Sequence, residues 1–150
     1  AKILIEIVKA IRAEVGASMP IFLRFSATDY REDGWDVEQT TQVAKWCADA
    51  GADLFDISTG GLVTGVTIPS GPGYQVPIAQ FVADRVDSPV AVVGQITTGA
   101  QAEEILQRGT VEVIMIGRAE LRDPMWPLRA AHELGVEVDY WPNQYSRGKF

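Results

Sequence analysis

One arginine lies inside a short apolar run, where its side chain needs a negative or strongly polar partner. In residues 21–26 (IFLRFS), the alternation of a strand places Arg24 on the face opposite Leu23 and Phe25. The face that packs against helices must be apolar, so we expect Arg24 to point into the interior, where an unpaired guanidinium costs about 3–5 kcal/mol. Two partners fit this position. One is Asp56 on the next strand, in a structural ion pair, and the other is the pyrimidine edge of a flavin, whose anionic reduced form a cation favours.

Each of the other apolar runs also has a polar residue or a glycine at its carboxyl end. Ser58 shares a face with Asp56, and it either hydrogen-bonds a bound isoalloxazine ring or caps its strand. Gly117 and Arg118 follow the last run and begin a helical turn, where backbone N–H groups, a glycine and an arginine fork together predict a phosphate site. Gly94 ends the preceding run and would let the same ligand approach. The alternative is that both glycines are ordinary turn residues.

Other reactive residues favour structural roles. Cys47 is the only cysteine and stands in a helical pattern, which is typical of a semi-buried thiol and not of a nucleophile. His132, the only histidine, lies late in the last helix and is expected at a surface. The sequence therefore predicts neither a metal site nor a nucleophilic triad.

The elements that position these residues alternate along the chain. We expect strands at 21–26, 54–58, 90–94 and 112–116, with a helix before the first strand and a helix after each strand. Nearly continuous apolar strands alternating with helices call for an α/β fold with a parallel sheet.

Two architectures contain such a sheet, and the residues that follow the first strand distinguish between them. A doubly wound sheet would place a G-x-G-x-x-G turn after this strand, and residues 24–29 (RFSATD) contain no glycine. A (β/α)8 TIM barrel places its site residues at the carboxyl ends of the strands, as here, and a whole barrel needs roughly 250 residues. We therefore expect residues 1–150 to be the C-terminal half of a single TIM-barrel domain, supplying about the last four strand–helix units, with 136–150 as a C-terminal tail.

The chain begins inside an amphipathic helix, without methionine or a capping residue, and so reads as part of something longer. Four parallel strands cannot close a barrel, so both outer edges should be paired by the missing N-terminal half or by a second chain. For the same reason, the interior residues Phe22 and Leu54 should lose their facing layer.

The amino-acid composition and the net charge indicate which compartment and which partners to expect. A chain with 47% hydrophobic and 22% charged residues is globular, and a net charge of −7 argues against nucleic acid as a partner. No stretch is long enough to span a membrane. A single cysteine fits a reducing compartment, and we expect a cytoplasmic protein.

Six segments, in order along the chain, resemble the second half of old yellow enzyme homologues. They are PIFLRFSATD (20–29), DLFDISTG (53–60), GYQVPIA (73–79), GQITTG (94–99), AEEILQ (102–107) and IMIGRAELRDP (114–124). The closing QYSRG (144–148) is similar to the tail of the bacterial thermophilic-like subclass of this family.

The resemblance implies an NAD(P)H-dependent ene reductase that uses FMN and reduces activated C=C bonds of enones and enals by hydride transfer from flavin N5. It implies that Arg24 contacts the flavin pyrimidine edge, that Ser58 contacts the flavin, and that Gly94, Gly117 and Arg118 bind the FMN phosphate. It also implies a homo-oligomer in which Arg147 reaches the active site of the neighbouring subunit. The family's proton-donating tyrosine and its substrate-holding pair, two histidines or a histidine and an asparagine, have no counterpart here, so we expect the isolated chain to be inactive.

Three features depart from the family pattern, and two other classes stay open. Gln95 and Thr98 replace residues more often found there, and the chain ends in Lys149-Phe150 where the subclass often has a tryptophan. Another FMN barrel, such as a dihydroorotate or inosinate dehydrogenase relative, would share the phosphate site but should show a catalytic cysteine or serine loop. The second class is a non-catalytic half-barrel fragment.

Overall fold

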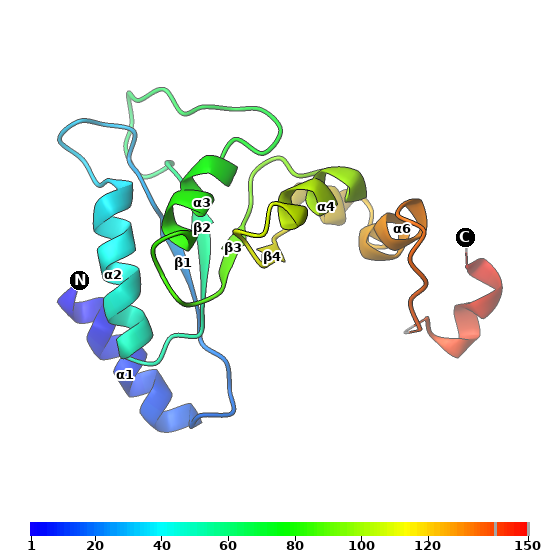
Figure 1. Ribbon diagram of the computed structural model, residues 1–150, viewed down its shortest axis with the longest axis horizontal. Coiled ribbons are helices and arrows are strands. Elements are labelled where there is room, and N and C mark those ends of the chain that lie inside the picture. Colours follow the sequence, from blue (N-terminus) through cyan, green and yellow to red (C-terminus); the bar gives the residue numbers. More distant parts are fainter. Residues whose placement is uncertain (140, 150) are drawn as a thin grey trace.

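The computed structural model describes residues 1–139 and 141–149 as a parallel sheet with helices packed along it (Figure 1). Phe150, the last residue of the expected tail, lies outside the described residues. The elements in chain order are α1 (Lys2–Val15), β1 (Phe22–Ser26), α2 (Val37–Asp49), β2 (Leu54–Ser58), α3 (Val76–Ala83), β3 (Val90–Val92), α4 (Gly99–Gln107), β4 (Val113–Ile114), α5 (Arg118–Arg122), α6 (Trp126–Glu133) and the 3-10 helix η1 (Asn143–Gly148).

The sheet has four parallel strands in the order β1-β2-β3-β4. Each strand pairs with the next one along the chain, so the sheet has no point at which the strand order reverses, as a doubly wound sheet would. Successive strand–helix units in this order are the building pattern of a (β/α)8 barrel. The predicted α/β class and parallel sheet are confirmed.

The last two strands are shorter than predicted. β3 ends at Val92 because the chain turns at Gly94 and Gln95, which both have positive φ, 131° and 52°. β4 contains only two residues, Val113 and Ile114, and pairs with β3 alone at the edge of the sheet. Short edge strands expose few unpaired backbone groups.

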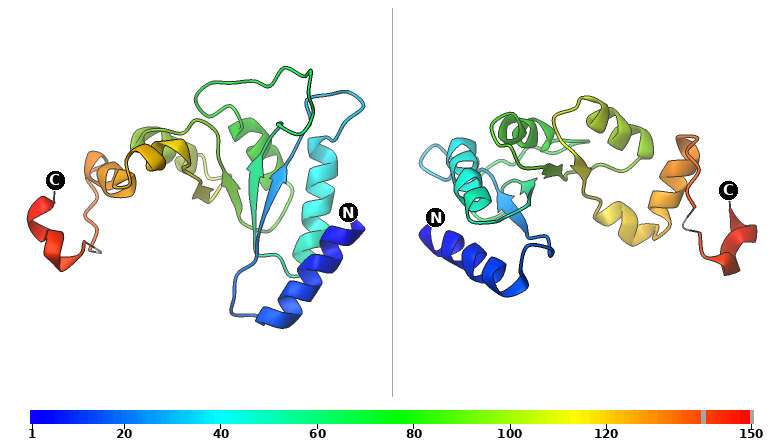
Figure 2. Two further views of the ribbon diagram at one scale, coloured as in Figure 1. Left: turned by 180° about the vertical axis from the view of Figure 1, so that it is seen from behind. Right: turned by 60° about the horizontal axis from the view of Figure 1, so that its bottom comes forward.

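The hydrophobic core lies between the sheet and its helices. Figure 2 shows α2, α3 and α4 following one another along one side of the strands. Phe55 and Ile57 of β2 and Val90 and Val92 of β3 are fully buried there. Burial of such side chains stabilises the fold by about 1.5–3 kcal/mol each.

The opposite face of the sheet is only partly covered. Phe22 is 61% exposed, as the sequence predicted for an interior residue without its facing layer. Leu54 is buried, so the same prediction for Leu54 is wrong. The difference follows from position, because β2 has a strand on each side, whereas β1 is an edge strand.

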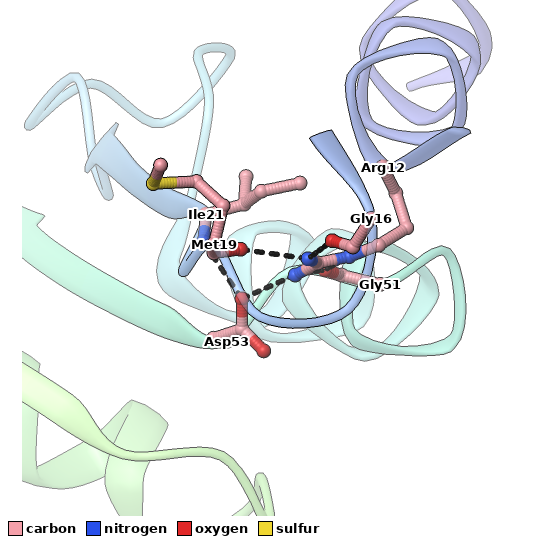
Figure 3. Close-up of polar contacts among 6 residues, drawn as sticks. All are labelled: Arg12, Gly16, Met19, Ile21, Gly51 and Asp53. Carbon is pink, nitrogen blue, oxygen red and sulfur yellow. Dashed lines mark hydrogen bonds and ion pairs between the residues drawn. The ribbon is translucent and has the colours of Figure 1, made fainter. Parts of the chain in front are cut away.

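At the amino-terminal end of the strands, Arg12 joins three segments (Figure 3). Its guanidinium donates to the carbonyl oxygens of Gly51 (2.7 Å), Gly16 (2.5 Å) and Met19 (2.7 Å), and it pairs with the Asp53 carboxylate. Arg12 thereby ties the end of α1 to the turns before β1 and β2. In barrels this end of the sheet serves stability, and chemistry takes place at the other end.

The remaining helices lie farther along the chain. α6 packs against α4, and no residue of η1 is buried (Figure 1). Among the described residues, no helix is both long and apolar enough to cross a membrane.

Candidate cofactor site

The carboxyl ends of the strands border a cavity of about 540 Å³. This volume falls within the range of small-molecule and cofactor sites. Its lining includes five of the residues that the sequence singled out, namely Arg24, Ser58, Gly94, Gly117 and Arg118. They come from four different segments, which meet because the strands are parallel and end at the same edge.

Arg24 and Asp56 form the predicted ion pair. Their Cα atoms are in register on β1 and β2, and Nη1 of Arg24 lies 2.5 Å from Oδ2 of Asp56. The carboxylate is buried, with 7% of its side chain exposed, while the arginine side chain is 54% exposed. Arg24 therefore lines the cavity and stays partly exposed even though it is paired, so the two partners considered for it are compatible.

Ser58 lies at the end of β2 and lines the cavity beside Arg24. Its hydroxyl donates to Oε1 of Gln75, 3.1 Å away. The proton is thus used within the protein, and the Ser58 oxygen can still accept a hydrogen bond from a ligand.

Gln75 is a site residue that the sequence analysis did not single out. It is 2% exposed, lies just before α3 and lines the same cavity. Its side-chain amide bridges the end of β2, at Ser58 and Thr59, to the carbonyl oxygen of Val93 after β3. The only signal in the sequence is a polar residue two positions before the helix proline Pro77, and a polar residue at the start of a helix is usually solvated.

Packing within the protein, without any ligand, requires a glycine at position 94. Its φ is 131°, and an added Cβ would lie 2.8 Å from Nε2 of Gln75. Both the left-handed backbone and this contact exclude a side chain. The glycine lets Gln75 pack against the main chain, and this explanation requires no ligand approach.

Gly117 and Arg118 follow β4, at the edge of the sheet away from β1, and both line the cavity. Among the described residues, apart from its two chain neighbours, none lies within 4 Å of where a Gly117 Cβ would be, and Gly117 lines the cavity. Arg118 and Arg122 lie one turn apart on α5, and both line the cavity. In residues 1–139 and 141–149, no backbone acceptor meets the amide N–H of Gly117 or Gly94. Two cations and free amides in the lining of one cavity are a donor set suited to a phosphate.

Three other residues lie away from this cavity. Arg147 is exposed on η1, so the structure does not bring it to the other five site residues. Cys47 is fully buried in the core, and burial raises the pKa of its thiol, which fits the structural role predicted for it. His132 lines a separate hollow with Trp141. The described residues contain no group of histidine, cysteine and acidic side chains that could hold a metal ion.

Sequence comparison identifies relatives of the chain. Residues 1–137 match the NADH:flavin oxidoreductase / NADH oxidase family. An NADPH dehydrogenase from Geobacillus thermodenitrificans is 44% identical over 129 residues, and one from Bacillus licheniformis is 42% identical over 146 residues. These alignments cover 86% and 97% of this chain but only 37% and 42% of the relatives, so the chain spans about two fifths of their length.

Solved structures share the fold. A 2-naphthoyl-CoA reductase in complex with 2-naphthoyl-CoA is 28% identical with a TM-score of 0.74, and 90% of this chain aligns with 21% of that chain. Histamine dehydrogenase from Rhizobium sp. 4-9, at 22% identity and a TM-score of 0.71, covers 87% of this chain and 19% of its own, and supports the fold alone. These neighbours are TIM-barrel flavoenzymes, which confirms the predicted barrel fold. The family match over residues 1–137, together with the two NADPH dehydrogenases, confirms the resemblance found in the sequence, and the chain belongs to the NADH:flavin oxidoreductase / NADH oxidase family.

Proposed function

We propose that the chain is the FMN-binding half of an NAD(P)H-dependent oxidoreductase that reduces the activated C=C bonds of enones and enals. The observation that carries the proposal is the cavity itself. Its lining includes a partly exposed arginine, Arg24, together with Gly117 and Arg118. The family assignment supports FMN as the cofactor and NAD(P)H as the reductant.

The residues present fit FMN. A phosphate needs cations and free N–H groups, which Arg118, Arg122 and the Gly117 amide supply. The isoalloxazine pyrimidine edge carries carbonyl oxygens and gains negative charge on reduction, and Arg24 offers it a cation. Ser58 lines the same cavity as Arg24 and offers a hydroxyl oxygen to the ring N–H.

With FMN bound, the site would transfer hydride from NAD(P)H to an activated alkene. This chain's own residues bind and orient the cofactor. Arg24 stabilises negative charge at the pyrimidine edge, and Asp56 holds the arginine in place while offsetting part of its charge. Arg118 would bind the phosphate end of the cofactor.

We propose that the groups that protonate and anchor the substrate belong to the part of the protein outside residues 1–150. The only histidine, His132, lines a different hollow, and the chain spans about two fifths of its relatives. We therefore propose that the isolated chain is inactive and that the missing N-terminal half, or a second chain, completes the barrel. We further propose a cytoplasmic homo-oligomer in which the exposed Arg147 reaches the active site of a neighbouring subunit.

Spectroscopy of the full-length protein tests this function. We expect the purified protein to show a visible flavin band that NADPH bleaches without oxygen and that 2-cyclohexen-1-one then restores. Bleaching by dihydroorotate but not by NADPH would assign the chain to another class of FMN barrel. Absence of any flavin band after reconstitution with FMN would contradict the proposal and favour the non-catalytic half-barrel.

A further inference from the structure

We propose that Gln75 is a positioning residue of the cofactor site, whose side-chain amide fixes Ser58 and Gly94 relative to each other so that FMN can bind between them. The inference rests on the proposed function, because it concerns the same cavity. Gln75 acts through the walls of the cavity and needs no contact of its own with the reacting atoms.

The contacts of Gln75 join two strand ends. Its Oε1 accepts from the backbone N–H of Thr59 at 2.6 Å, from the Thr59 hydroxyl at 2.8 Å and from the Ser58 hydroxyl at 3.1 Å. Its Nε2 donates to the carbonyl oxygen of Val93 at 2.8 Å. One amide therefore connects the residues that follow β2 with those that follow β3.

The backbone partners determine which way the amide points. A backbone N–H can only donate, so the atom facing Thr59 N must be the oxygen, and a carbonyl can only accept, so the atom facing Val93 O must be the nitrogen. Only a side chain with an acceptor on one branch and a donor on the other satisfies both strand ends. Glutamate with its proton meets this requirement, and the glutamate anion does not.

Close packing also connects Gln75 to the segment after β3, at Gly94. Three Gln75 atoms (Nε2, Cγ and Cβ) lie 2.8–3.2 Å from where a Gly94 Cβ would be. The carbonyl oxygen of Gly94 also accepts from the N–H of Gly73, at 2.9 Å, in the segment leading to Gln75. The main chain at Gly94 is thus held from both sides by the segment that carries the glutamine.

The loop after β1 joins this network through Thr59. The hydroxyl of Tyr30 donates to Oγ1 of Thr59 at 2.8 Å, and Thr59 in turn donates to Gln75. Thr59 is buried, so these bonds are shielded from water and from competing partners. The network therefore connects the segments that follow β1, β2 and β3.

The decisive experiment measures the FMN dissociation constant of the full-length Gln75→Glu protein across pH, as a ratio to the wild type at each pH. Titration of the FMN phosphate affects the dissociation constants of both proteins equally, so its effect cancels in the ratio. A buried glutamate titrates above its ordinary pKa of about 4.3. At the acid end, the protonated side chain donates to Val93 and accepts from Thr59, so we expect a ratio close to one. Above the pKa, the carboxylate faces the Val93 carbonyl, and we expect FMN binding to weaken roughly tenfold.

Two further variants separate positioning from general stability. Gln75→Met keeps the length of the side chain without its hydrogen bonds, and we expect roughly tenfold weaker FMN binding that does not depend on pH relative to the wild type. Gln42→Glu makes the same chemical change on an exposed residue of α2 and should leave FMN binding unchanged at every pH. Thermal unfolding of each FMN-stripped protein identifies any variant that loses affinity because it is unfolded.

The outcomes distinguish this inference from the proposed function. If the wild type binds FMN and Gln75→Glu shows the same ratio at all pH values, or if folded Gln75→Met binds FMN like the wild type, the positioning role is overturned while the function stands. If the wild type itself does not bind FMN, the proposed function is overturned and this inference with it.

Discussion

Nη1 of Arg24 lies 2.5 Å from Oδ2 of Asp56, and the Cα atoms of the two residues are directly paired on adjacent parallel strands. The second carboxylate oxygen of Asp56, Oδ1, is buried without a hydrogen-bond partner among the described residues. A buried carboxylate with one satisfied oxygen depends strongly on its cation. Asp56 therefore holds the arginine in place and also lowers the net positive charge that Arg24 presents to the cavity.

The first prediction concerns the flavin reduction potential. Asp56→Asn removes the counter-charge of Arg24, so the anionic reduced flavin should be better stabilised and the potential should rise by about 30 mV, equivalent to roughly 1.4 kcal/mol in a two-electron couple. Arg24→Gln should lower it by a similar amount. Reductive titration against a reference dye measures both. Wild-type potentials in both variants would mean that the pair is structural only.

The second prediction concerns the phosphate. Arg118→Ala in the full-length protein should weaken FMN binding by roughly 1.5–3 kcal/mol, the contribution of a charge-assisted hydrogen bond. Arg108→Ala is the matched control, because Arg108 pairs with Glu104 on α4 and does not line the cofactor cavity. Flavin fluorescence titration gives both dissociation constants. Equal FMN dissociation constants for the two variants would show that Arg118 does not bind the phosphate.

The third prediction concerns acid stability at the opposite end of the sheet. The Asp53 carboxylate accepts from the Ile21 N–H at 2.7 Å and pairs with Arg12, and together these hold the pKa of Asp53 below its ordinary value (Figure 3). A lowered folded-state pKa contributes stability that is present above the unfolded value, about 3.9, and is lost as pH falls through the folded value.

Asp53→Asn should therefore reduce the free energy of unfolding at pH 7, and this deficit should shrink below about pH 4, where the wild type loses the same contribution. Urea denaturation at neutral and acid pH measures the difference. Asp87→Asn, a change of an exposed residue near β3, should have little effect at either pH. A deficit in Asp53→Asn that is equally large at acid pH would argue against the carboxylate's charge as its cause.

The fourth prediction concerns Arg147. Because this residue is exposed on η1 and lies outside the cavity, Arg147→Ala should leave FMN affinity unchanged. If the side chain reaches a neighbouring subunit, the KM for the alkene should rise in the intact oligomer. A structure of the oligomer with Arg147 packed on its own subunit, far from any neighbour's strand ends, would defeat this assignment.

Much of the site follows from sequence because it depends on local pattern. Strand alternation placed Arg24 and Asp56 on one face, and parallel neighbours in sequence order brought them into register. The parallel order also explains why Ser58 and Gly117, far apart in the chain, border one cavity.

Gln75 could not be found in the same way. Its burial depends on how the long segment after β2 folds back over the ends of β2 and β3, and this path has no periodic pattern. The role of Gly94 was missed for the same reason, since the side chain that excludes a Cβ there belongs to Gln75. Arg122 could have been inferred, because it follows Arg118 at the four-residue spacing of one helix face.

A crystal structure of the full-length protein with FMN tests the central claim most directly. It should show the FMN phosphate within hydrogen-bond distance of the Gly117 main chain and the Arg118 guanidinium, and the pyrimidine edge of the ring facing Arg24. A phosphate bound away from Gly117 and Arg118, or a ring whose pyrimidine edge faces away from Arg24, would contradict the assignment of this cavity.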